Sequence, residues 1–241
     1  MINVSIKKSQ FENFDFLKPK NELYSKFWVN GELVEEVSDH LVKIATDILK
    51  KLDMDINIKD VVITGSIASY NWHSLSDIDL HIVLDFNQVD DNFELVKRFL
   101  DEIRINWNKT HDIFIRGHEV ELYFQHSEEE HKANGVWSLY QGQWFEPPKK
   151  QDTDLDLRTT EIKAENIARS IEHVEHLFAT KEYEDCFEYA KKIRKKISTM
   201  RKAGLQQEGI YSPENLAFKM LRNSGYLEKL SNLRVKSYDQ M

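Results

Sequence analysis

Two hydrophobic patterns follow one another along this chain. In the first part, short apolar runs separated by polar turns accompany two longer segments whose apolar residues recur at helical spacing. After a polar break at residues 147–152 the pattern is helical throughout. This order predicts an α+β fold, with a small mixed-sheet domain followed by an all-helical C-terminal domain. We place these domains at residues 1–150 and 151–241.

In the first domain, helical spacing predicts helices over residues 35–52 and 92–107. Residues 1–30 are rich in aromatic side chains, and we expect irregular chain or a short helix packed on the core. Asn30-Gly31 marks a turn. Residues 67–75 form a short helix or loop, and residues 136–145 a strand or loop. The predicted strands are 60–64, 77–84, 113–116 and 118–125, with Gly117 joining the last two.

In the second domain, apolar residues recur at helical spacing over 162–178 and again over 187–200. Because the connection between these segments is short, they should pack as an antiparallel pair. Ser212-Pro213 is a favourable helix start, with serine as the cap and proline in the first turn. Ser224-Gly225 should end that helix. One or two further helical turns are expected over residues 227–233.

Charge is unevenly divided between the two parts. The 241 residues carry a net charge of −8, and residues 1–150 hold 17 basic against 26 acidic side chains. An acidic surface is poorly suited to long duplex DNA, whose binding depends on neutralising phosphates. It suits a site that gathers divalent cations. We therefore do not expect the protein to bind long duplex DNA.

Cysteine content and apolar run length bear on the compartment. Cys186 is the single cysteine, which excludes an intramolecular disulfide and fits a reducing environment. Its place in a helical pattern predicts a buried residue. The first ten residues lack the apolar run of a signal peptide, and nowhere do 18 apolar residues follow one another. The sequence predicts a soluble cytoplasmic protein without a membrane partner.

The strongest chemical signal is a Gly-Ser turn followed by two alternating carboxylates. Gly65-Ser66 ends an apolar strand, and Asp77 and Asp79 follow after ten intervening residues. Strand residues two apart point to the same face, about 6–7 Å from each other. Such carboxylates suit divalent cations about 3.5–4 Å apart. The turn offers close backbone approach and donors for phosphate oxygens.

This constellation, including Ser76 before the first aspartate, resembles the nucleotidyltransferase superfamily that contains DNA polymerase β. The resemblance covers about residues 35–126. It implies a third carboxylate between apolar neighbours on a later strand, where Glu121 fits best and Glu119, of the same strand parity, is the alternative. The third acid is glutamate, where aspartate is commoner in the family.

The resemblance also implies the role of each residue. Asp77 and Asp79 would hold the metal ion that grips the triphosphate, and Asp79 with Glu121 the ion that activates the attacking hydroxyl. Ser66, next to Gly65, would bind a terminal phosphate oxygen. The implied cofactors are two Mg²⁺ or Mn²⁺ ions, and carboxylates together with phosphate oxygens are what Mg²⁺ prefers.

The implied reaction transfers a nucleoside monophosphate from a nucleoside triphosphate (NTP) to a hydroxyl acceptor and releases pyrophosphate. The NTP, ATP among the candidates, is the donor, and the acceptor stays open between a small molecule, an RNA 3′ end and a protein. The chain as a whole also resembles uncharacterised nucleotidyltransferases predicted in bacteriophages, which would place it in the host cytoplasm.

An alternative on the same fold is a catalytically weak or inactive nucleotide-binding or regulatory protein. Many small family members carry an Arg-Gly pair soon after the Gly-Ser turn. Here residues 67–70 contain no cation. Phosphate charge must then be met elsewhere or by metal alone.

Several other side chains have two interpretations. His81 shares strand parity with the two aspartates and is either a group beside the metal ions or a hydrogen-bonded histidine. His173 and His176 share a helix face, as a metal pair or as exposed residues. The basic residues 191–196 with Arg201-Lys202 form a solvated helix face or a patch for a triphosphate or an RNA end. The aromatic candidates, for base stacking or core packing, are Trp72, Trp137, Tyr140 and Trp144.

Overall fold

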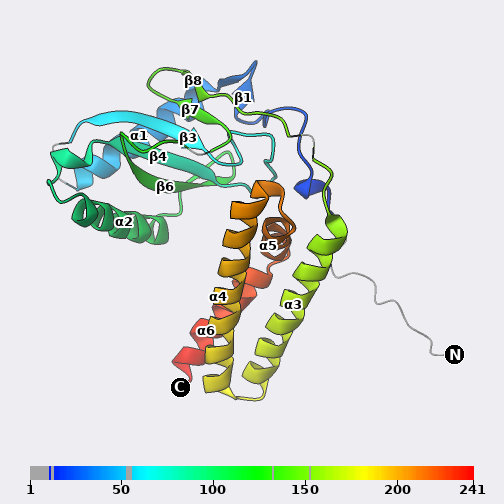
Figure 1. Cartoon of the computed structure of the whole chain (residues 1–241). Helices are drawn as coiled ribbons and strands as arrows, with labels where there is room; N and C mark the ends of the chain where they lie inside the picture. The colour runs from blue at the N-terminus through cyan, green and yellow to red at the C-terminus, as the bar shows by residue number, and fades with distance from the viewer. Residues whose placement is uncertain (1–10, 12–13, 53–55, 132, 152) are drawn as a thin grey trace. The chain divides into compact units, whose positions relative to one another are not determined.

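The computed structural model describes residues 11, 14–52, 56–131, 133–151 and 153–241 (Figure 1). Residues 1–10 and Asp152, which entered the sequence-based expectations, lie outside the described residues. The chain forms two compact units. The first spans Pro19–Asp152, and the second combines Thr153–Met241 with the described part of residues 1–18.

The N-terminal segment differs from its expected place. Phe11 and Leu17, which ends a short 3₁₀ helix (Asp15–Leu17), are buried in the core of the helical unit. Phe11 therefore packs with the helices of the second unit, whereas Phe27 and Trp28 are buried in the core of the first unit. The proposed domain limits at residue 150 stay a prediction.

The first unit is built on a six-stranded mixed sheet of order β5-β6-β4-β3-β7-β8. Neighbouring strands are antiparallel except β4 and β6, which are parallel. Together with six helices in the described chain, this confirms the mixed α+β prediction. The strands are β3 (Ile58–Thr64), β4 (Ile78–Leu84), β5 (Phe114–Ile115), β6 (His118–His126), β7 (Val136–Ser138) and β8 (Gln143–Glu146).

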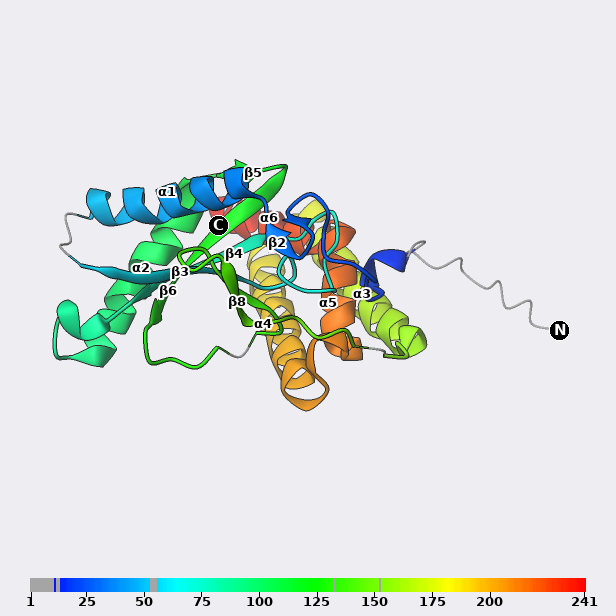
Figure 2. The same ribbon diagram turned by 90° about the horizontal axis from the view of Figure 1, so that it is seen from above.

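One face of the sheet is covered by α1 (Glu35–Lys51) and α2 (Phe93–Thr110), as Figure 2 shows from above. In β4, Ile78, Leu80 and Ile82 are buried in this core. The residues between them point to the other face, because side chains alternate along a strand. The alternation therefore sends polar residues to a face that the two helices leave uncovered.

Glycine lies in the turns of β-hairpins in the first unit. A small hairpin of β1 (Trp28–Val29) and β2 (Glu32–Leu33) turns at Asn30 and Gly31, whose φ angles of 53° and 84° are both left-handed. This conformation suits an Asn-Gly pair. Residues 136–145, expected as a strand or a loop, form most of the β7–β8 hairpin.

The second unit consists of helices α3 to α6 around its own core (Figure 1). Ser212 caps α5 by accepting a hydrogen bond from the Asn215 amide, as its position before proline predicts. The last helix was expected to be one or two turns long, and this was wrong. It runs for 14 residues, and only Leu230 and Ser237 in it are buried. Because so few of its residues face the core, the apolar pattern in the sequence is too weak to show its full length. The helices are α3 (Leu157–Ala179), α4 (Tyr183–Gln207), α5 (Pro213–Asn223) and α6 (Tyr226–Asp239).

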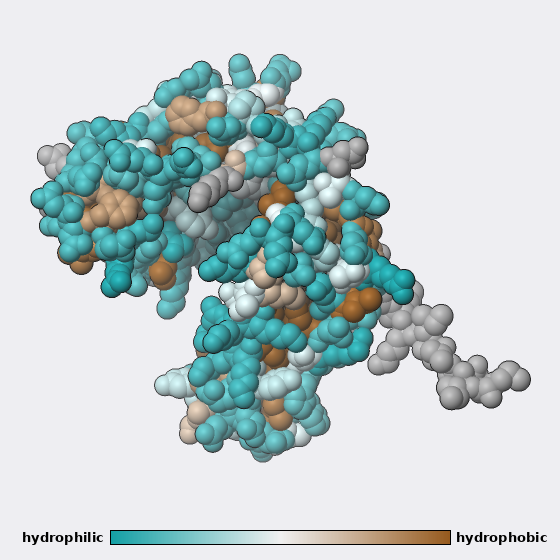
Figure 3. Space-filling model, in the orientation of Figure 1, coloured by the Kyte–Doolittle hydropathy of each residue, from teal (hydrophilic) through white to brown (hydrophobic). Residues whose placement is uncertain are grey.

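The visible surface is mostly hydrophilic, with hydrophobic side chains in scattered groups (Figure 3). This agrees with charged residues making up 31% of the chain. No helix in the described part of the chain combines the length and the apolar character needed to cross a membrane.

A chain of polar side chains crosses the uncovered face of the sheet. Thr64 Oγ1 lies 3.2 Å from His81 Nε2, and His81 Nδ1 lies 3.1 Å from Gln125 Oε1. A neutral imidazole with its proton on Nδ1 donates to Gln125 and accepts from the Thr64 hydroxyl. Burial lowers the pKa of His81 to about 4. His81 is thus a hydrogen-bonded histidine, the plainer of its two interpretations.

Replacing His81 should flatten the dependence of stability on pH. Because its pKa is about 4 in the folded protein and the ordinary pKa of histidine is 6.5, the unfolded chain binds a proton between these pH values and the folded protein does not. The free energy of unfolding should therefore fall by about 1–2 kcal/mol from this group between pH 7 and pH 5.

Urea unfolding of His81→Gln at both pH values measures this difference, with His40→Gln, an exposed histidine of α1, as the control. The control should keep the pH dependence of the unchanged protein. An equally steep loss of stability in His81→Gln would contradict the assignment.

Candidate functional site

The parallel pairing of β4 with β6 brings two of the predicted carboxylates side by side. Asp79 is the register partner of Glu121. Both side chains are half-buried and lie on the face away from the helix-covered core. Because neighbouring strands are about 4.8 Å apart, two acidic side chains paired in this way can approach a common ion. The register thus joins residues that are far apart in sequence.

The Gly65 backbone lies against one of these acids. Thr64, the last residue of β3, pairs with Asp79, and Gly65 follows with a left-handed φ of 75°. A Cβ atom at this position would overlap the carboxylate of Asp79. Glycine is therefore required here twice, for its conformation and for the close approach of the acid.

Hydrogen bonds at Ser76 close the loop between the turn and the acidic strand. The Ser66 hydroxyl donates to Ser76 Oγ over 2.8 Å, and the His73 amide donates to the same oxygen over 3.0 Å. The Ser76 carbonyl oxygen lies 2.7 Å from Nδ1 of buried His118. The loop is thereby held at both ends, with Ser66 beside the residue that precedes Asp77.

Tyr123 is the residue of this site that the sequence analysis missed. Its hydroxyl donates to Glu121 Oε2 over 2.7 Å, and its ring stacks on His81 with centroids 4.9 Å apart. Burial and the Glu121 carboxylate raise the pKa of Tyr123, so the phenol keeps its proton. The signal was its strand parity, which it shares with Glu121.

A cation also lies beside this tyrosine. The guanidinium carbon of Arg104, in α2, is 5.2 Å from the centre of the Tyr123 ring. Arg104 Nε pairs with Asp101 at 3.3 Å. The residues after the Gly-Ser turn supply no cation, and Ile67, Ala68 and Ser69 are buried. Arg104 therefore brings a positive charge from a helix to the tyrosine that donates to Glu121.

The two remaining candidate acids sit at strand ends. Asp77 is half-buried and immediately precedes β4. Glu119 is half-buried and lies before Val120, where the β4–β6 pairing begins opposite Ile78. The register therefore favours Glu121 over Glu119 as the partner of Asp79. Within the described residues, no three His, Cys, Asp or Glu side chains are grouped closely enough to hold a metal ion by themselves.

A pocket of about 620 Å³ opens beside the paired acids. Thr64, the register partner of Asp79, lines it from β3. His81, Tyr123 and Gln125 line it from β4 and β6, two or four residues along from Asp79 or Glu121 on the same face. Its other side is formed by the loop after β6, which contributes Glu129, Glu130, His131 and Ala133.

Three of the four aromatic candidates are packed against other rings, whereas Tyr140 is exposed. Trp72 stacks on Tyr24 with centroids 4.0 Å apart, and Trp144 stacks on Trp28 at 4.5 Å. Trp137 is buried in the core. In the helical unit, His173 meets the Tyr189 ring edge-on at 5.1 Å, and Cys186 is buried as expected. These contacts favour core packing for the three tryptophans, and His173 and His176 are exposed residues of α3.

Comparisons with known proteins bear on the first unit. No curated protein matches the chain. One solved structure that aligns with it is the STING-associated CdnE c-di-GMP synthase from Capnocytophaga granulosa, at 11% identity, over 87% of this chain and 84% of that one. The TM-score of 0.21 is too low for this likeness to support an inference.

The family comparison is more informative. Residues 41–140 match the Nucleotidyltransferase domain family. The matched segment contains β3, β4 and β6 with the Gly65 turn and the Asp79–Glu121 pair. This part of the chain is therefore similar to nucleotidyltransferase domains.

Proposed function

We propose that this protein is a metal-dependent nucleotidyltransferase that moves a nucleoside monophosphate from an NTP to a hydroxyl acceptor and releases pyrophosphate. The observation that carries the proposal is the pairing of Asp79 with Glu121 against the Gly65 turn, inside the segment that matches the domain family. Asp79, Glu121 and the Gly65 turn meet at one end of the β3–β4–β6 sheet.

The acids fit divalent cations by their chemistry. Carboxylate oxygens are the ligands that Mg²⁺ prefers, and Mg²⁺ is usually held by one or two carboxylates completed by water and phosphate oxygens. The absence of a closed three-residue cluster among the described side chains therefore agrees with ions that arrive with the nucleotide. Asp77, Asp79 and Glu121 would hold two ions, which stabilise charge on the entering and leaving oxygens when bound.

The remaining site residues position the substrate and the acids. Ser66, held by Ser76, can turn its hydroxyl to a terminal phosphate oxygen, and the missing side chain at Gly65 lets the Asp79 carboxylate lie against the turn. The Tyr123 hydroxyl fixes the orientation of Glu121 by donating to one of its oxygens. The second oxygen of that carboxylate then remains available to a cation.

The pocket beside the acids supplies space for the acceptor. Its lining on the strands is uncharged, because His81 is neutral near pH 7 and Thr64 and Gln125 carry no charge. A volume of about 620 Å³ lies within the range of small-molecule sites. The hydroxyl group could belong to a small molecule, an RNA 3′ end or a protein side chain.

A second candidate is a nucleotide-binding or regulatory protein without turnover. It is favoured by the buried, uncharged residues Ile67, Ala68 and Ser69 after the turn, which cannot supply a cation to the phosphates. Titration calorimetry with Mg²⁺ and each NTP separates the two candidates. Binding without pyrophosphate release across a broad acceptor panel would favour the regulatory protein.

Removing both aspartates should abolish Mg²⁺-dependent NTP turnover. Asp77→Asn with Asp79→Asn deletes two charges that the proposed ions need, while both side chains keep their size. Pyrophosphate release measures turnover, and circular dichroism tests the fold. Asp90→Asn with Asp91→Asn, two exposed loop residues, is the matched control and should retain activity. An unchanged rate of pyrophosphate release in the Asp77→Asn, Asp79→Asn variant would contradict the proposal.

The same assay decides between Glu121 and Glu119 as the third metal ligand. Glu121→Gln should lower turnover by about 100-fold or more, equivalent to about 3 kcal/mol of transition-state stabilisation. Glu119→Gln should lose much less, because the register pairs Asp79 with Glu121. Equal losses, or a greater loss in Glu119→Gln, would transfer the third ligand to Glu119.

The Gly65 turn offers a test with a matched backbone. Gly65→Ala should lower turnover by at least about tenfold, equivalent to about 1.4 kcal/mol, because its Cβ displaces the Asp79 carboxylate. Gly117→Ala is the control: its φ is also left-handed, at 84°, but a Cβ there meets nothing within 4 Å. Both variants carry similar backbone strain. Equal activity in the two would argue against a functional contact at Gly65.

A further inference from the structure

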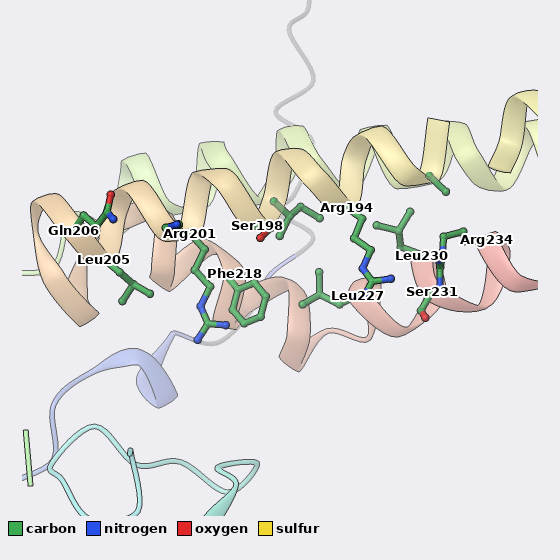
Figure 4. A pocket seen from close by; sticks show the side chains of 13 residues that line it. Arg194, Ser198, Arg201, Leu205, Gln206, Phe218, Leu227, Leu230, Ser231 and Arg234 are labelled. Carbon is green, nitrogen blue, oxygen red and sulfur yellow. The ribbon is translucent and has the colours of Figure 1, made fainter. Parts of the chain in front are cut away.

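A second concave site lies in the helical unit, where α4, α5 and α6 meet (Figure 4). Its volume is about 580 Å³, which is in the range of small-molecule sites. Leu205, Phe218, Leu227 and Leu230 give it an apolar lining. We call it the helical groove.

Four cations line the helical groove, and none of its described lining residues is acidic. Arg194, Arg201 and Lys202 come from α4, and Arg234 comes from α6. The basic sequence run is therefore divided: these side chains line the groove, whereas the exposed lysines 191, 192, 195 and 196 do not. In a chain of net charge −8, this concentration of positive charge stands apart.

The arginine side chains are arranged around the apolar lining. The guanidinium carbon of Arg201 lies 4.1 Å from the centre of the Phe218 ring, and its Nε donates to Asn215 Oδ1 over 3.1 Å. Figure 4 shows Arg194 reaching from α4 towards α6, near Leu227. Buried Nε of Arg234 makes no hydrogen bond to any described residue. A buried N–H donor of this kind is costly unless an acceptor reaches it.

The neighbourhood is electrostatically positive. The pKa of Lys219, next to Phe218 on α5, is lowered to about 8, mainly by burial and further by Arg201 and Arg222. The two arginines therefore add positive electrostatic potential at Lys219. An anion placed in the helical groove would relieve this repulsion and accept hydrogen bonds from the guanidinium groups.

We infer that the helical groove binds a small organic anion that joins a carboxylate, sulfonate or phosphate group to an apolar body the size of one or two rings. Inorganic anions would leave the leucine and phenylalanine surface uncovered, and an uncharged ring would leave Arg234 Nε without an acceptor. The described residues that line the helical groove all belong to the second unit, and its occupation does not depend on the proposed transfer reaction.

Three probes separate the contributions of charge and apolar contact. Anilinonaphthalene sulfonate carries both, phenylnaphthylamine carries a similar apolar body without the charge, and inorganic phosphate carries the charge alone. With the full chain, the sulfonate should bind saturably at one site with enhanced fluorescence. Phenylnaphthylamine should bind at least about tenfold more weakly, the loss expected for about 1.4 kcal/mol of charge-assisted contact. Phosphate at the same concentration should displace little of the sulfonate.

Variants assign the binding to the helical groove. Arg194→Gln with Arg234→Gln should weaken sulfonate binding at least about tenfold and leave phenylnaphthylamine binding nearly unchanged. Lys192→Gln with Lys195→Gln removes two charges from the same basic run outside the groove and should change neither. Leu227→Ala should weaken both ring-containing probes. Circular dichroism checks each fold, and Arg194→Gln alone, at an exposed residue, is the fallback variant.

The outcomes are distinct from those of the transfer reaction. Asp77→Asn with Asp79→Asn, measured without Mg²⁺, should bind the sulfonate as the unchanged protein does. Equal sulfonate affinity in the arginine and lysine double variants would overturn the inference. Equal affinity for the charged and uncharged probes would overturn it too, as would the absence of saturable sulfonate binding.

Discussion

The parallel hydrogen-bonded pairing between β4 and β6 is the constraint on which the first unit's chemistry depends. It places Asp79 opposite Glu121 and His81 opposite Tyr123 in one register. A shift of one residue would turn every polar side chain of either strand into the helix-covered core. Burial of Ile78, Leu80 and Ile82 against that core therefore also holds the acids on the open face.

Around that register, each polar group has a partner that limits its motion. Gly65 brings its backbone against the Asp79 carboxylate, Ser76 closes the loop onto Ser66, and Tyr123 donates to Glu121. None of these contacts needs a long-range charge. The site is pre-organised by packing and by short hydrogen bonds, which is what positioning of phosphate and metal ions requires.

The two units concentrate side chains of opposite charge. The first gathers carboxylates on a sheet, where Mg²⁺ and a nucleotide would complete the balance of charge. The second gathers arginines on helices around an apolar groove, where Arg234 has a buried N–H without an acceptor among the described residues. An anionic ligand in the groove would balance the charge of the arginines, as metal ions would balance the charge of the carboxylates in the first unit.

Local sequence determined the helices, most strands, the Asn30-Gly31 turn and the Ser212 cap, because periodicity and turn chemistry act over a few residues. It also grouped Asp77 with Asp79, since strand parity is local. Tertiary structure decided which glutamate faces Asp79, that Tyr123 binds it, that Phe11 packs with the helical unit, and which cations of the basic run line the groove. These depend on register and packing between segments distant along the chain, for which no short pattern carries a signal.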